Sequence, residues 1–185
     1  MFTARKVAQM AAYFADRQGG RINILKLMKL LYLADRGAMI AHGEPISFDY
    51  FVSMDHGPVL SRTLNLINGT YPDHMAADWD EWISDREGHV IASNRRFGRD
   101  DLDQLSDADL EVLDSTWRAF GHMNQWELVE YTHKNLPEWQ NPNGSSIPIL
   151  EETILTSAGI PADKAKLLAE AIATEHKLDR ALADV

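Results

Sequence analysis

Apolar residues occupy almost every position of residues 24–35, which read Ile-Leu-Lys-Leu-Met-Lys-Leu-Leu-Tyr-Leu-Ala-Asp. At 3.6 residues per turn these side chains point in all directions, so the run predicts a helix that is surrounded by other elements. Lys26 and Lys29 interrupt it, and it is too short to span a bilayer. We expect Asn23 to cap its start and Gly43 to end it.

The central helix is predicted to supply much of the core, through Leu27, Met28, Leu31, Tyr32 and Asp35. Because Asp35 lies in line with the apolar positions, it is expected to point inward. A buried carboxylate is costly without a donor, which we expect from Tyr50, His56 or an arginine.

Three basic residues, Lys26, Lys29 and Arg36, lie close to one side of the same helix. We interpret them as a narrow stripe that faces solvent. The alternative is that the stripe meets an acidic surface of a partner protein.

Polar and apolar residues alternate over residues 46–53. This period of two predicts a strand with Ile46, Phe48, Tyr50 and Val52 on its buried face. The dipeptide that begins at Gly57 then predicts a stop, with Pro58 at the first position of a new helix.

The other patterns are helical, except for a hairpin over residues 82–92 that turns near Glu87-Gly88. With residues 46–53 this hairpin would form a three-stranded antiparallel sheet. Residues 70–81 are expected to be a loop, and Ser106 and Asn124 to start two helices. The predicted fold class is α+β, mostly α: about seven helices around a buried central helix, with a small antiparallel β-sheet.

Composition limits what the chain can do. It has 185 residues, of which 45% are hydrophobic, and this suits one packed domain with an extension. We divide it into a domain over residues 1–145 and a C-terminal helical extension over residues 146–185. A net charge of −10 argues against nucleic acid as the main partner. No signal peptide is predicted, so a cytoplasmic location is expected.

The sequence shows no constellation that predicts a catalytic, cofactor or metal site. It has no cysteine, and its seven histidines lack the spacing of a helical zinc site. One enzymatic alternative is kept, in which His56 acts with Asp35 or His133 in a hydrolase-like reaction.

Trp139 follows Pro137 in a turn-rich segment. Its side chain is expected either to attach this loop to the core or to be exposed as a binding anchor, as tryptophan often is at interface hot spots.

Several short motifs in a fixed order resemble one known family. Residues 26–35 are followed by Asp55-His-Gly-Pro-Val59, and later by Leu-Val-Glu-Tyr-Thr-His at residues 128–133 and Pro-Glu-Trp at residues 137–139. This order is similar to that of the Panacea domain, the family of SocA-like antitoxins, whose members show a KL-x-KLLY-x-A helix and a YGPV turn. Here histidine replaces the aromatic residue of that turn, and Glu138 separates the family's proline and tryptophan.

The resemblance implies a bacterial or prophage protein of the cytoplasm that neutralises a toxin by direct protein–protein contact. In the SocA case it implies an adaptor that delivers the toxin to a ClpXP-type protease. We expect the partner-binding surface to include Asp55, His56, Gly57, Pro58, Arg62 and Trp139. A phage-encoded adaptor without a toxin partner is the remaining alternative.

Overall fold

The predicted central helix is the element around which the chain folds. In the computed structural model, which describes residues 1–71 and 73–183, this helix is α2 (Ile24–His42). Asn23 caps it by accepting from the backbone N–H groups of Leu25 and Lys26, and Gly43 ends it in the left-handed conformation. Its side chains are buried from Ile24 to Asp35 except at Leu25, so this part of the helix has no solvent-exposed face.

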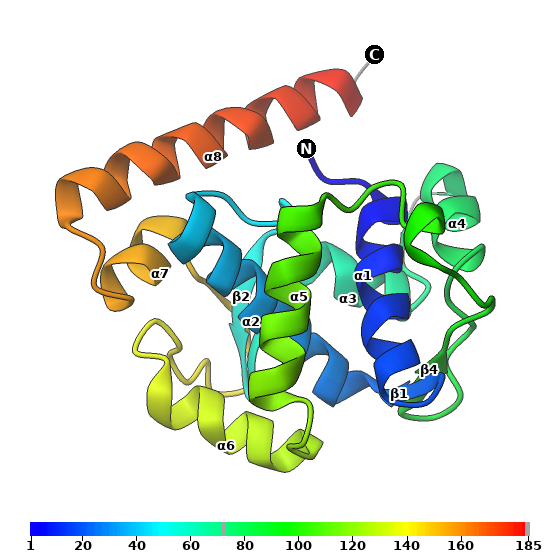
Figure 1. The fold of residues 1–185 in the computed structure, drawn as a ribbon. Helices are drawn as coiled ribbons and strands as arrows, with labels where there is room; N and C mark the ends of the chain where they lie inside the picture. Colours follow the sequence, from blue (N-terminus) through cyan, green and yellow to red (C-terminus); the bar gives the residue numbers. More distant parts are fainter. Residues whose placement is uncertain (72, 184–185) are drawn as a thin grey trace.

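Three helices make most of the helix contacts with α2. They are α1 (Ala4–Arg17), α5 (Asp107–Phe120) and α6 (Gln125–Asn135). Figure 1 shows α2 passing behind α5, with α6 across one end of the body. Capping boxes start α5 at Ser106 and α6 at Asn124, as the sequence predicts.

The described residues contain eight α-helices and five short strands, so the prediction of a mostly helical α+β fold is confirmed. The remaining helices are α3 (Ser61–Ile67), α4 (Asp73–Asp80), α7 (Glu151–Ser157) and α8 (Ala162–Ala183), with a 3₁₀ turn at Arg99–Asp101. The loop predicted for residues 70–81 is wrong from residue 73 on, since α4 lies there and buries Trp79.

The strands form two small antiparallel sheets instead of the predicted three-stranded one. In the first, β1 (Arg21–Asn23) pairs with β4 (Val90–Ala92). In the second, β2 (Phe51–Met54) lies between β3 (Gly57–Leu60) and β5 (Ile147–Pro148). The hairpin expected over residues 82–92 turns back as predicted, because Ile83 bridges Ser93 and Glu87 bridges Val90. It joins β1, however, and not β2.

The segment before β2 also departs from the prediction. Residues 46–50 are not a strand, and the buried positions over residues 47–53 are Ser47, Asp49, Phe51 and Ser53, on the side opposite to the one expected. Ser47 and Asp49 are buried because they make hydrogen bonds that the alternation pattern does not encode. Ser47 donates to Asp35, and Asp49 accepts from the backbone N–H groups of Arg62 and Thr63 at the start of α3.

Of the residues predicted to form a C-terminal extension, β5 pairs with β2, and α8 lies at the end of the molecule opposite α6. Figure 1 shows α8 crossing over this end, with the N-terminus beneath it. The N–H of Phe2 donates to Asp179 in α8 over 2.9 Å. α7 buries Ile154 and Leu155, whereas Leu167, Leu178 and Leu182 of α8 remain exposed. The last two residues of the predicted extension, 184–185, lie outside the described residues.

Candidate functional site: the β2–β3 turn and its groove

The β2–β3 hairpin brings the family-like motif to the surface as a tight turn. Met54 pairs with Gly57, which leaves Asp55 and His56 as the two exposed turn residues. An oxygen of Asp55 accepts from the N–H of Gly144 over 2.9 Å, and this bond fixes the turn against the loop before β5. The sequence prediction that Gly57-Pro58 starts a helix is wrong, because strand pairing extends to Leu60 and α3 begins at Ser61.

Gly57 is required at this turn for two reasons. Its φ is +95°, a conformation that residues with a Cβ rarely adopt. A Cβ at this position would also lie 2.6 Å from the Oγ1 of Thr132 and 3.0 Å from the Cε of Lys29. The turn is therefore pressed against α2 and α6, and it cannot shift without disturbing both.

The basic stripe predicted for α2 does not face solvent. Lys29 is fully buried and Lys26 is 7% exposed, because α2 is covered on all sides. The Nζ of Lys29 donates to the carbonyl of Pro58 over 2.7 Å, and Lys26 donates to Gln18 and to the carbonyl of Gly121. The two lysines thus tie the strand and the loop to the central helix.

Arg36 belongs to a second buried polar group. Its Nε donates to Glu138 over 2.7 Å, and the hydroxyl of Tyr32 donates to the same oxygen over 3.1 Å. Burial and the nearby Glu138 carboxylate raise the pKa of Tyr32 well above its ordinary value. The Glu138 that interrupts the family's proline–tryptophan pair therefore binds this loop to α2.

Trp139 is half-buried and attached to the domain. Its Nε1 donates to the carbonyl of Met54 over 3.0 Å, and its ring stacks on His133 at 3.8 Å between centroids. The tryptophan therefore braces the end of β2, next to the turn.

A groove of about 510 Å³ opens beside the turn. Its apolar lining includes Met28, Val59 and Leu64, and its polar lining includes Lys29, Asp55, His56, Arg86 and His89. Trp126, 58% exposed at the start of α6, forms one wall and contacts the ring of His56 edge-on at 5.6 Å. The sequence analysis identified His56 and Asp55 but missed Lys29 and Trp126 as parts of the same surface.

Burial lowers the pKa of two basic groups beside the groove. Burial lowers the pKa of Lys29 to about 7. The pKa of His133 is also lowered, mainly by burial and further by the charges of Lys29 and His56. This side of the turn therefore gathers several basic side chains, although the whole chain is acidic.

Arg62 lies apart from the other predicted contact residues. It follows β3 at the open end of the hairpin, where its NH1 is 3.6 Å from Asp179 of α8 and its guanidinium lies over the ring of Phe2. Asp55, His56, Gly57 and Pro58 lie at the turn end, with Trp139 beside them. The six residues consequently mark two surfaces at opposite ends of one hairpin.

The prediction of which group donates a hydrogen bond to Asp35 is wrong. Asp35 is fully buried and accepts from the backbone N–H and the hydroxyl of Ser47, instead of Tyr50, His56 or an arginine. Burial raises its pKa to about 7. A carboxyl sealed behind Ser47 cannot reach a substrate, so the structure offers no support for a reaction that pairs it with His56. Within residues 1–71 and 73–183, no cluster of three or more His, Asp or Glu side chains is placed to hold a metal ion.

The geometry is that of a tight turn beside a groove, and most of this region is matched in the comparison with protein families. A family model described as antitoxin SocA-like, Panacea domain, matches residues 27–140. The chain belongs to this family. The resemblance predicted from the motifs is thereby confirmed. No curated protein and no solved structure matches the chain.

The Panacea match begins inside α2 and ends just after Trp139. It includes the turn, Lys29, Trp126 and most of the groove, whereas β5, α7 and α8 lie outside it. None of the helices in the described part of this Panacea protein has the length and hydropathy needed to cross a membrane.

Proposed function

We propose that this chain is the antitoxin of a toxin–antitoxin pair and neutralises its toxin by direct binding. Membership in an antitoxin-like family supports this role and favours a binding protein over an enzyme. The observation that carries the proposal is the turn of Asp55 and His56, which Gly57 and the buried Lys29 hold in one conformation. A preorganised turn loses little entropy when a partner binds.

The interface that we propose is centred on this turn and on Trp126. An exposed tryptophan on a rigid helix start, next to an apolar groove, has the character of an interface hot spot. Trp139 supports the turn from behind and contributes its exposed edge.

α8 is proposed as a second contact surface. Leu167, Leu178 and Leu182 leave apolar area on its outward side, where a partner could bury it. Delivery of the bound toxin to a ClpXP-type protease would need such a surface in addition to the toxin site, and we propose α8 for that role. The domain of residues 1–145 would then bind the toxin, and residues 146–185 would bind the protease.

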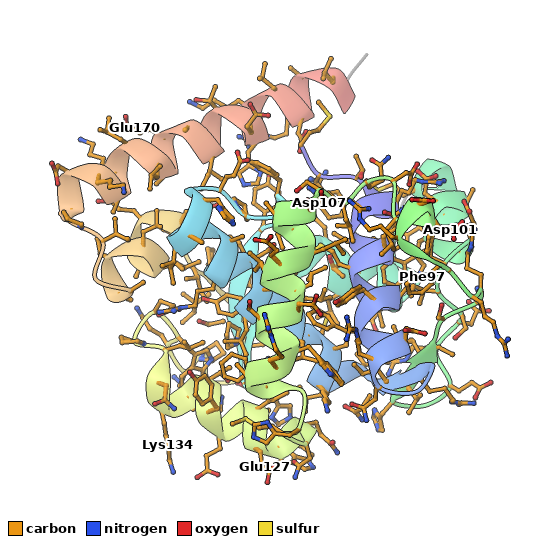
Figure 2. The ribbon with its side chains drawn as sticks, in the orientation of Figure 1. Phe97, Asp101, Asp107, Glu127, Lys134 and Glu170 are labelled. Atoms are coloured by element: carbon orange, nitrogen blue, oxygen red, sulfur yellow. The ribbon has the colours of Figure 1, made fainter. Side chains whose placement is uncertain are left out.

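Co-expression with the product of the adjacent gene tests the proposal. We expect that product to arrest growth alone, and the intact chain to restore growth and to co-purify with it. A Trp126→Ala variant should weaken the complex by more than about 1 kcal/mol. The matched control is Lys134→Ala, because Lys134 lies on the outer side of the same helix (Figure 2) and is exposed.

Truncation after Gly159 separates the two surfaces, since it removes α8 but keeps β5 and the buried residues of α7. The truncated chain should still bind the toxin and lose only protease delivery, measured as the toxin's half-life in cells. A neighbour that is harmless alone and forms no complex would refute the antitoxin proposal. It would leave the adaptor without a toxin partner as the better account.

A further inference from the structure

The groove beside the turn combines two chemistries that seldom occur together on an acidic protein. Its floor is apolar and includes Met28, Val59 and Leu64, and its wall is the exposed ring of Trp126. Lys29, Arg86, His56 and His89 line the same space. In a chain of net charge −10, this is a local excess of basic groups.

The basic side chains of the groove make hydrogen bonds to neutral groups, whereas most other arginines of the described chain contact carboxylates. Arg5, Arg17, Arg36 and Arg99 each contact a carboxylate. Arg86, in contrast, donates to the side-chain oxygen of Asn68 and to the carbonyl of Gly88, both of which are neutral.

Lys29, which is buried, also has a neutral hydrogen-bond partner. Its ammonium can donate three hydrogen bonds, and the bond that the described residues provide ends on the carbonyl of Pro58. The one carboxylate that lines the groove, Asp55, is engaged by the N–H of Gly144. The groove thus holds two cationic side chains whose hydrogen bonds end on neutral oxygens.

We propose that this groove binds an acidic segment of the toxin in which one carboxylate lies next to a large apolar side chain. The carboxylate would pair with the exposed guanidinium of Arg86, with the buried ammonium of Lys29 behind it, and the apolar side chain would pack on Met28, Leu64 and the ring of Trp126. This inference rests on the proposed antitoxin function and specifies the chemistry by which the toxin is recognised. A carboxylate supplies a charged acceptor for Arg86, whose hydrogen bonds within the described residues end on neutral oxygens, and the apolar floor favours a peptide over an isolated anion.

The proposal predicts a pH dependence. The groups that face Lys29 in the groove and behind it are His56, His89, His133, Asp55 and Arg86. Lys29, whose pKa is about 7, loses most of its charge between pH 6 and pH 8. Affinity for a carboxylate should therefore fall by up to about tenfold over this range through Lys29.

The first experiment titrates the intact chain with acetyl-Asp-Phe-amide, followed by the NMR signals of the Trp126 indole and the Leu64 methyl groups. The isosteric acetyl-Asn-Phe-amide and adenosine monophosphate are the reference probes. We expect the aspartyl peptide to bind about tenfold or more tightly than the asparaginyl peptide at pH 6, and to shift these two residues first. Equal binding of both peptides, no binding of either, or tighter binding of the nucleotide would overturn the proposal.

Variants locate the preference within the groove. Arg86→Gln should reduce the aspartyl-over-asparaginyl preference several-fold. Arg96→Gln, which changes another exposed arginine outside the groove, should leave it unchanged. Lys29→Met keeps an unbranched side chain but removes the ammonium, and it should abolish most of the pH dependence. If it fails to fold, Arg86→Gln alone decides, and an unchanged preference there contradicts the proposal.

The two proposals fail in different ways. If the toxin binds the chain equally well with Arg86→Gln and Lys29→Met, the groove proposal is wrong and the antitoxin function stands. If the aspartyl peptide binds with the expected preference but the adjacent gene product forms no complex, the antitoxin function is wrong and the groove chemistry stands.

Discussion

α2 and α8 are the two longest helices of the described chain, and they differ in how far the rest of the protein covers them. α2 is covered by α1, α5, α6 and the β2–β3 hairpin, whereas α8 lies on one end of the body with Leu167 and Leu178 exposed. α8 buries only a narrow face, which includes Ala165, Ile172, His176 and Asp179.

The difference extends to their buried polar groups. On α2, Asp35 is satisfied by Ser47, and Lys29 by Pro58. Under α8, the Nδ1 of His176 and one oxygen of Asp179 have no hydrogen-bond partner among the described residues, and the Nε2 of His176 has only the carboxylate of Glu151 at 3.5 Å. Unpaired buried polar atoms cost free energy, so α8 should be much less firmly attached than α2. From this comparison we expect α2 to serve as the scaffold of the domain and α8 to be the more loosely held surface.

The largest expected effect comes from shortening one leucine on each helix. Leu31→Ala removes a fully buried side chain and should cost about 4 kcal/mol of unfolding free energy, because α2 cannot relax into the cavity. Leu167→Ala, at a site 67% exposed, should change it by less than about 0.5 kcal/mol. Urea unfolding of both variants measures the difference. Similar losses at the two sites would refute the contrast.

The next effect is a pH dependence that belongs to α2. The pKa of Asp35 is raised from 3.8 to about 7 in the folded chain, so the folded state binds more protons than the unfolded state between these values. Its contribution to stability is complete below about pH 4 and is lost as pH rises through 7. In Asp35→Asn this loss should disappear, a change on the order of 2–4 kcal/mol between pH 4 and pH 8.

Lys29 should act in the opposite direction. Its pKa falls from 10.5 to about 7 on folding, so its contribution is present at high pH and is lost as pH falls through 7. In Lys29→Met the free energy of unfolding should therefore depend less on pH above pH 7. In Asp35→Asn it should depend less on pH below pH 7. Denaturant titrations from pH 4 to pH 10 check both, and parallel curves for wild type and variants would contradict the assignment.

A third effect on stability concerns Asp49, which caps the start of α3 although it lies well before that helix in the sequence. Its carboxylate accepts from the N–H groups of Arg62 and Thr63 over 2.8 and 2.7 Å, and burial raises its pKa. Asp49→Ala should cost about 2–3 kcal/mol, because a cap is lost and buried N–H groups are left unpaired. Asp163→Ala, in the exposed first turn of α8, is the matched control and should cost much less. Calorimetric melting of the two variants measures this.

The smallest effect tests the attachment of α8. Asp179→Ala removes the partner of Arg62 and of the Phe2 N–H, but also a carboxylate oxygen that has no partner. We expect less than about 1 kcal/mol in global stability, because the two changes offset each other, and faster hydrogen exchange confined to α8. Glu170→Ala, on the outward side of α8 (Figure 2), should change neither. Faster exchange throughout α2 would show that the two helices unfold together.

The parts of the fold that the sequence predicts well are those with local signals. α2 is recognisable from its apolar run, and its ends from Asn23 and Gly43. Ser106 and Asn124 likewise mark two helix starts. Each signal acts within one or two turns, so no knowledge of the remaining fold is needed.

Several of the errors concern side chains whose partners are distant in sequence. The sequence pattern predicts Lys29 at the surface, but β3 covers it and accepts its hydrogen bond. The pattern also predicts that Ser47 and Asp49 face solvent, but they are buried because Asp35 and the start of α3 provide hydrogen-bond partners. Gly57-Pro58 reads as a helix start because proline favours that position, yet pairing with β2 keeps it extended. The family motif located the turn, but only the fold brings Trp126 and Arg86 to the same groove.

Hydrogen exchange of the chain alone and with the adjacent gene product tests the central claim most directly. The account predicts that binding slows exchange over residues 54–60 and around Trp126, while residues 27–35 of α2 are already protected and do not change. Absence of a complex, or protection that spares both the turn and Trp126, would contradict it.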